Sequence, residues 1–194
     1  MYQRLPSWVL GFHGTDAATV KRVLNSNSLS LHPSNNDYDW LGSEIYFWEN
    51  DPERAKSFVL EKMKREGDKQ KPEVIGAVID LGFCMNLVDR PALLELKAAH
   101  DHLAEDMRIL GLDMPKNMGP TDDLLRRNLD KAVFDQVHKL REKSGLDRYQ
   151  TVRSPFLEGK ALYANTFFKL KTHVQIAVRD PSCVKGYFLP RQAK

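Results

Sequence analysis

The order of the predicted elements limits the folds that this chain can adopt. Short apolar and β-branched runs near both ends predict strands, whereas residues from about 90 to 150 carry apolar side chains at helical spacing. Strict alternation of strand and helix is absent, and so are the Gly-x-Gly-x-x-Gly and Walker A motifs. The pattern therefore predicts an α+β fold and excludes a doubly wound dinucleotide-binding fold.

The individual elements follow from periodicity and from capping residues. Strands are expected at Trp8–Phe12, Ile45–Trp48, Val74–Leu81, Phe156, Leu162–Tyr163, Val174–Val178 and Tyr187–Leu189. Helices are expected to begin at Thr15 or Asp16, Asp51, Pro91 and Thr121, and the last two to end at Gly111 and Gly145. We therefore expect a single domain over residues 1–194, with a helical insertion at about residues 90–150.

Composition narrows the class of protein. No run approaches the roughly 20 apolar residues that a membrane-spanning helix needs, and residues 1–11 lack the order of a secretory signal. Two cysteines, Cys84 and Cys183, are too few for a metal knuckle and are interpreted as reduced thiols. His100 and His102 stand two apart on a predicted helix and point in different directions, so no metal site is expected. We expect a cytoplasmic protein with no membrane contact.

Positive charge is concentrated in residues 121–172. This region holds 11 Lys and Arg against 7 Asp and Glu, and 11 − 7 gives +4, whereas the whole chain carries +3. A solvated helical face explains this excess, and so does contact with an acidic or nucleic-acid partner.

Three segments carry residues suited to holding a flat, amide-bearing ring. The first is Phe12-His13-Gly14-Thr15, in which Gly14 has no Cβ and so lets a flat ligand approach its N–H and C=O groups. The second is Leu41–Phe47, where strand alternation puts Ile45 and Phe47 on one face and Glu44, Tyr46 and Trp48 on the other. The third is the predicted strand Thr172–Val178, which places Gln175 in its centre.

In this order, the three segments resemble the His-Tyr-Glu signature of the ADP-ribosyltransferases of the diphtheria-toxin and poly(ADP-ribose) polymerase type. The resemblance implies a split antiparallel β-sheet core and NAD as the substrate, with no metal. By the resemblance, His13 holds a ribose hydroxyl, and Gly14 and Thr15 bind the same end of NAD. Tyr46 and Phe58 grip the two faces of the nicotinamide ring, where each stacking contact contributes about 0.5–1.5 kcal/mol.

Gln175 departs from the family's pattern, since the family has a glutamate there. A carboxylate about 4 Å from a developing oxocarbenium ion would stabilise it by up to roughly 4 kcal/mol at an effective dielectric of 20. Glutamine keeps the hydrogen bond to a ribose hydroxyl and lacks the charge, so transfer of single ADP-ribose units is expected. Glu158 and Glu44 are the two candidates to supply a carboxylate instead. Arg153 and Arg179 are candidates to contact the pyrophosphate.

The resemblance implies a mono-ADP-ribosyltransferase whose catalytic residues are His13, Tyr46 and Gln175. Its acceptor is a macromolecule, either protein or nucleic acid, and the basic region 121–172 is a candidate contact. Related small, unsecreted enzymes are toxins held by an antitoxin, including phage-defence effectors. Two alternatives stay open, an NAD glycohydrolase and a catalytically inactive module that binds NAD or ADP-ribose.

Overall fold

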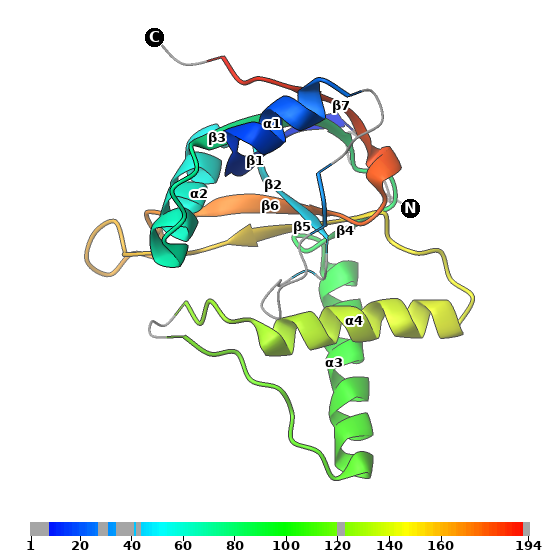
Figure 1. Cartoon of the computed structure of the whole chain (residues 1–194). Helices are drawn as coiled ribbons and strands as arrows, with labels where there is room; N and C mark the ends of the chain where they lie inside the picture. The colour runs from blue at the N-terminus through cyan, green and yellow to red at the C-terminus, as the bar shows by residue number, and fades with distance from the viewer. Residues whose placement is uncertain (1–7, 27–30, 34–40, 42–43, 120–122, 192–194) are drawn as a thin grey trace.

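A computed structural model of the chain describes residues 8–26, 31–33, 41, 44–119 and 123–191. The described part is a mixed α and β architecture (Figure 1). In chain order, its elements are β1 (Trp8–Asp16), α1 (Ala17–Leu24), β2 (Ile45–Glu49), α2 (Pro52–Glu66), β3 (Pro72–Asp80), β4 (Cys84–Asn86), α3 (Arg90–Leu110), α4 (Asn128–Lys143), β5 (Thr151–Phe156), β6 (His173–Val178), a 3-10 turn (Pro181–Cys183) and β7 (Val184–Phe188).

These strands form one seven-stranded sheet in the order β4-β5-β6-β2-β1-β3-β7. All neighbouring pairs are antiparallel except β4 and β5, which are parallel. Strands from the two ends of the chain thus lie side by side, since β6 pairs with β2 and β7 pairs with β3. The sheet is therefore mixed: its strands are antiparallel except for the short strand β4, which lies parallel to β5 at the edge.

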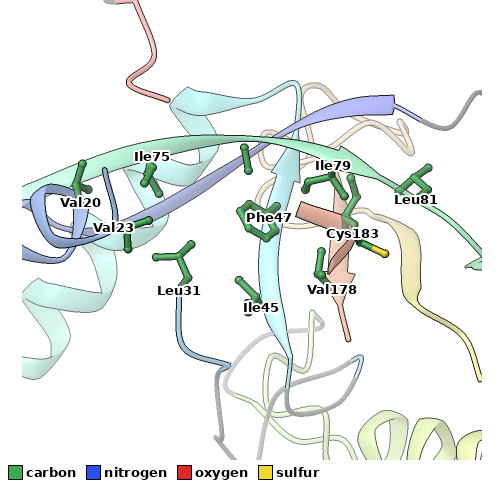
Figure 2. Close-up of a cluster of buried hydrophobic side chains, with 12 residues drawn as sticks. Val20, Val23, Leu31, Ile45, Phe47, Ile75, Ile79, Leu81, Val178 and Cys183 are labelled. Atoms are coloured by element: carbon green, nitrogen blue, oxygen red, sulfur yellow. The ribbon is translucent and has the colours of Figure 1, made fainter. Parts of the chain in front are cut away.

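The two faces of the sheet carry separate groups of helices. On one face, α1 and the strands enclose a cluster centred on Phe47, which Figure 2 shows between Ile45 and Ile79. On the other face, α2 packs on β1 and β3, and α3 and α4 pack beside β4, β5 and β6. Figure 1 shows α3 and α4 together at one end of the molecule, with α3 projecting away from the sheet. Both helices lie within residues 90–150, where helical structure was expected.

Most of the local signals act as expected. Asp51 caps α2 by accepting a hydrogen bond from the backbone N–H of Arg54 at 2.8 Å, and Pro52 occupies the first turn. Asp16, the second of the two candidates, caps α1. Gly111 ends α3 in the left-handed conformation, with φ of 67°. The expected cap at Thr121 lies outside the described residues, and α4 begins instead after Arg127.

Two expectations about strands were wrong, and one strand was missed. The first strand was expected to end at Phe12, but β1 continues to Asp16 because it pairs with β3 along nine residues. Leu162 and Tyr163 lie in an exposed loop between β5 and β6 and form no strand. The three-residue strand β4 was not expected at all, because it is too short to show a period.

Candidate functional site

The site is built where β1 and β2 separate. These two strands are paired only at Gly11 with Glu49 and at Phe12 with Trp48, although β1 continues beyond this point. At the next position, Nδ1 of His13 lies 2.7 Å from the carbonyl oxygen of Tyr46. The side chain of His13 therefore bridges the two strands just where their ladder ends.

The state of the His13 ring follows from this contact. A carbonyl oxygen only accepts a hydrogen bond, so Nδ1 carries the proton and Nε2 is the unprotonated nitrogen of the neutral ring. Burial lowers the pKa of His13, and the hydrogen bond to Tyr46 opposes that shift only in part. The ring is thus neutral at pH 7, with Nε2 able to accept a hydrogen bond.

Gly14 is a point of close approach between β1 and α2. A Cβ atom at this position would lie 2.3 Å from the backbone oxygen of Ala55 and 3.0 Å from the Cβ of Val59. Only glycine therefore allows α2 to pack at this distance. The neighbouring Thr15 donates a long hydrogen bond of 3.4 Å to Asp16, the cap of α1.

The structure brings the three signature segments onto neighbouring strands, β1, β2 and β6. Gln175 lies directly opposite Trp48, two residue pairs along the ladder from the pair formed by Tyr46 and Ala177. Alternation puts Tyr46 and Gln175 on the same face of the sheet. His13 is directed toward the opposite face, where its ring centroid lies 5.9 Å from that of Phe47.

Phe58 stacks with a different aromatic residue than expected. Its ring centroid lies 4.8 Å from that of Trp48 at an interplanar angle of 44°. Tyr46 instead packs with the α3 and α4 cluster, and its phenol oxygen accepts a hydrogen bond from the backbone N–H of Leu41 at 2.8 Å. The aromatic pair of this site is thus Trp48 and Phe58. Trp48 lies on the same face of the strand as Tyr46, so the strand alternation in the sequence could have identified Trp48 as a candidate for the site.

A buried ion pair stands beside this aromatic pair. Nη2 of Arg54, on α2, lies 3.0 Å from Oε2 of Glu158, and the two side chains are only 10% and 6% exposed. The guanidinium carbon of Arg54 lies 5.8 Å from the ring centroid of Trp48 and 6.0 Å from that of Phe58. Cation–π contacts and the carboxylate thus both hold the guanidinium in place.

His173 completes this group at the start of β6. Its ring centroid lies 6.2 Å from that of Trp48, and its Nδ1 lies 2.6 Å from the carbonyl oxygen of Lys171. Burial lowers the pKa of His173, as does the charge of Arg54, whereas Glu158 opposes the shift. We refer to Trp48, Arg54, Phe58, Glu158 and His173 as the polar cluster.

The polar cluster contains buried atoms that make no hydrogen bond within the described ranges. They are three N–H donors and one ring nitrogen: Trp48 Nε1, Arg54 Nε and Nη1, and His173 Nε2. Buried polar atoms are normally paired, because each unpaired one costs about 1–3 kcal/mol. Such a concentration of unpaired atoms is typical of a site prepared for a polar ligand.

The other charged candidates are already paired outside the polar cluster. Glu44 lies 2.9 Å from Arg179, at the opposite end of β2 from Trp48. Arg153 forms a bidentate pair with Glu49, at 2.6 and 3.1 Å. Of the two candidate carboxylates, Glu158 is therefore the one beside the aromatic pair. Arg54 has two N–H donors without a hydrogen-bond partner in the described ranges, Nε and Nη1. Nothing in the local sequence distinguished it from other arginines on helices.

The loop between β5 and β6, residues 157–172, contributes Glu158 to the polar cluster. It is fastened to α2 by Glu158, which pairs with Arg54, and by Lys171, whose Nζ lies 2.7 Å from Glu61. Lys169 pairs with Asp123 at 2.7 Å. The outer side of the loop exposes large apolar side chains: Leu157, Leu162, Tyr163, Phe167, Phe168 and Leu170.

The basic region 121–172 is largely neutralised by pairing. Many of its cations contact a carboxylate, namely Arg127, Lys131, Arg141, Arg148, Arg153, Lys169 and Lys171. Its positive charge is thus interleaved with acidic side chains.

The rest of the described surface provides fewer candidate functional groups than the polar cluster. A shallow hollow is lined by Trp8, Val9, Leu10, Asn50 and Val78, none of which titrates near neutral pH. Among the described residues, no group of three or more His, Cys, Asp and Glu side chains could hold a metal ion. Within the same residues, no helix is both long and apolar enough to cross a membrane.

Comparison with known proteins gives one distant similarity. The chain is 24% identical over 193 residues to the uncharacterized protein MJ0359 of Methanocaldococcus jannaschii, covering 90% of this chain and 83% of that protein. No model of a protein family matches the chain. No solved structure matches it either.

Proposed function

We propose that this protein is an NAD-dependent mono-ADP-ribosyltransferase with the fold of that superfamily, and that it needs no metal. It cleaves the bond between nicotinamide and ribose and transfers ADP-ribose to a macromolecular acceptor. The observation that carries the proposal is the convergence of the three signature segments. Residues 12–15, 45–47 and 172–178 are far apart in the sequence but lie on the adjacent strands β1, β2 and β6, and His13 links the first two.

The packing at Gly14 and the aromatic contact of Trp48 with Phe58 support a site for a planar ring. Gly14 lies against α2, and Phe58 of the same helix faces Trp48. In the proposed site, Trp48 takes the stacking role first assigned to Tyr46. Tyr46 then acts as a positioning residue, because its backbone carbonyl fixes the ring of His13.

Glu158 supplies the carboxylate that Gln175 lacks. It is buried in the polar cluster, whereas Glu44 is held by Arg179 away from it. A carboxylate about 4 Å from the developing positive charge on the ribose would contribute up to roughly 4 kcal/mol at an effective dielectric of 20. Gln175, opposite Trp48, is placed to hydrogen-bond a ribose hydroxyl.

NAD binding in this proposal requires the 157–172 loop to move away from α2. The unpaired atoms of the polar cluster are buried, and the pairs of Glu158 with Arg54 and of Lys171 with Glu61 fasten the loop to α2. Once NAD is bound, Arg54 offers two donors, Nε and Nη1, to its pyrophosphate or hydroxyl oxygens.

The biological setting rests on the resemblance alone. Within the proposal, the protein is an intracellular toxin or phage-defence effector that an antitoxin neutralises. Its acceptor is a protein or a nucleic acid. The interleaved charges of residues 121–172 favour a protein surface over a nucleic-acid backbone, because phosphate binding draws on unpaired cations.

The test is nicotinamide release from NAD by the purified protein, alone and with cell lysate. The wild type is compared with Glu158→Gln and with Glu105→Gln, a control on the exposed surface of α3. Release that depends on lysate, persists in the control and falls at least about 100-fold in Glu158→Gln is the expected result. Release at the same rate without lysate identifies an NAD glycohydrolase instead.

A binding module is the second candidate, and Gln175 is the observation that favours it. Such a module would bind NAD or ADP-ribose through the same residues without breaking the glycosidic bond. Calorimetric NAD binding by wild-type protein that releases no nicotinamide in any lysate would establish it. The absence of both binding and release would refute the NAD site itself.

A further inference from the structure

His173 has the ring orientation of a proton acceptor. The carbonyl oxygen of Lys171 lies 2.6 Å from its Nδ1, so Nδ1 carries the proton and the lone pair of the neutral ring is on Nε2. Nε2 is buried and has no hydrogen-bond partner among the residues that the structure describes. An unprotonated ring nitrogen is thus held ready within the polar cluster.

The ring is fixed on both sides by aromatic residues. Its centroid lies 6.2 Å from that of Trp48 and 5.6 Å from that of Phe156, with interplanar angles of 48° and 36°. His173 is also two residues before Gln175 on β6, so both side chains are on the same face of the sheet. The His173 side chain therefore lies on the same face of the sheet as the proposed NAD site.

The charged groups that face His173 come from two elements. Arg54 and Asp51 belong to α2 and its cap, and Glu158 belongs to the loop after β5. Burial and Arg54 lower the pKa of His173, whereas the hydrogen bond to Lys171, Glu158 and Asp51 raise it, and the net shift is downward. The ring is consequently neutral, and able to accept a proton, at and above its ordinary value of 6.5.

We propose, on the basis of the ADP-ribosyl transfer described above, that Nε2 of His173 takes the proton from the attacking group and that this group is an alcohol hydroxyl. The C1′–N bond of NAD breaks, and its electron pair leaves with nicotinamide, which becomes neutral. A C1′–O bond forms to the hydroxyl oxygen. The hydroxyl proton passes to Nε2, and the imidazolium then releases it to water.

This assignment distinguishes between acceptor chemistries. A carboxylate acceptor has no proton to lose at pH 7, so a dedicated base beside the site would have no role. A hydroxyl is a poor nucleophile until its proton is removed, and general-base catalysis of this kind contributes about 100-fold or more. The buried, unpaired Nε2 thus favours an ether-like product linkage over an ester.

The experiment compares the wild type with His173→Asn, His173→Gln and His100→Gln. Asparagine can keep the hydrogen bond to Lys171 but has no base at the position of Nε2, and His100 is a histidine on the surface of α3. Transfer of labelled ADP-ribose in lysate, NAD affinity by calorimetry and the pH profile of transfer are measured. The linkage is then treated with neutral hydroxylamine, which cleaves esters and leaves acetals intact.

We expect both His173 variants to bind NAD as the wild type does and to transfer about 100-fold more slowly, while His100→Gln is unaffected. Wild-type transfer should fall in acid with a midpoint below the ordinary value of 6.5, because burial lowers the pKa of His173, and the variants should lack this fall. The product should resist hydroxylamine. Wild-type rates in both variants, or a hydroxylamine-labile product, would overturn the inference while leaving the transferase proposal intact. If the wild type releases no nicotinamide, the transferase proposal itself fails.

Discussion

Nδ1 of His13, on β1, lies 2.7 Å from the carbonyl oxygen of Tyr46, on β2, at the point where the ladder between these strands ends. The contact has two separable consequences. It ties the two strands together, and it directs Nε2, which accepts no hydrogen bond from any residue that the structure describes, away from the backbone. Substitutions that keep one consequence and remove the other can therefore separate folding from binding.

His13→Asn and His13→Ala provide this separation. Asparagine can still donate a hydrogen bond to the carbonyl of Tyr46, whereas neither variant has an acceptor at the position of Nε2. A contact of NAD with Nε2, on the opposite face of the sheet from Trp48 and Gln175, would cost both variants about tenfold in NAD affinity, whereas an effect through the link between the strands would cost only His13→Ala that affinity. Only His13→Ala should also lower the thermal midpoint. Calorimetry and thermal unfolding check this, and an unchanged NAD affinity in both variants would remove His13 from the site.

Gly14→Ala should destabilise the fold and disturb the site together. The added methyl group would lie 2.3 Å from the backbone oxygen of Ala55, so α2 must move away from β1, at a cost of about 1–3 kcal/mol. Gly186→Ala on β7 is the matched control, because no atom lies within 4 Å of the added group. Urea unfolding should show a lower midpoint only for Gly14→Ala. Equal midpoints for the two variants would contradict the close packing.

The sequence predicted those features of the fold that depend on neighbouring residues. Asp51 and Pro52 mark the start of α2, and Gly111 marks the end of α3, because capping involves only atoms within one turn. The extension of β1 through His13 depends on its partner β3, about 60 residues away, and so no local pattern reveals it. The strand expected at Leu162 does not form, since the backbone pairing there is limited to the isolated bridge of Ala161 with Lys169 and its flanking hydrogen bonds.

The site could be predicted only in part, for a related reason. His13, Tyr46 and Gln175 were proposed as site residues because they belong to short motifs that resemble a known signature. The pair formed by Arg54 and Glu158 joins positions 104 apart in the sequence, and neither stands in a motif. The exchange of Tyr46 for Trp48 as the partner of Phe58 depends on where α2 crosses the sheet. Such placements are set by tertiary packing.

Lys171→Ala should make the proposed site easier to reach. Lys171 and Glu61 are half exposed, so their pair contributes only about 0–1 kcal/mol to stability. The same pair fastens the 157–172 loop to α2, and its loss should raise amide hydrogen exchange in the loop and lower the apparent dissociation constant for NAD. Lys160→Ala, in the same loop but without an ion pair in the described structure, should change neither. Identical exchange in both variants would show that the pair does not hold the loop.

His138 should make the protein sensitive to acid. Burial, together with the charges of Arg179, Arg141 and Arg148, lowers the pKa of His138 to about 3, and neither ring nitrogen has a partner within the described part of the chain. As the pH falls below 6.5, the unfolded chain binds a proton at this residue and the folded protein does not. The free energy of unfolding should therefore decrease by up to about 1.4 kcal/mol per pH unit from this residue alone.

His138→Phe tests this contribution directly. Phenylalanine keeps a planar ring beside Tyr149 and removes two buried nitrogens that lack partners, so stability at about pH 7.5 should be equal or higher. Between about pH 7.5 and about pH 5, the free energy of unfolding measured in urea should fall less in the variant than in the wild type. The difference should equal the contribution of one proton bound by the unfolded chain. His100→Gln, at an exposed position, should lose as much as the wild type. If His138→Phe follows the wild-type pH dependence, the acid sensitivity belongs to His13 and His173, whose pKa values are also lowered by burial.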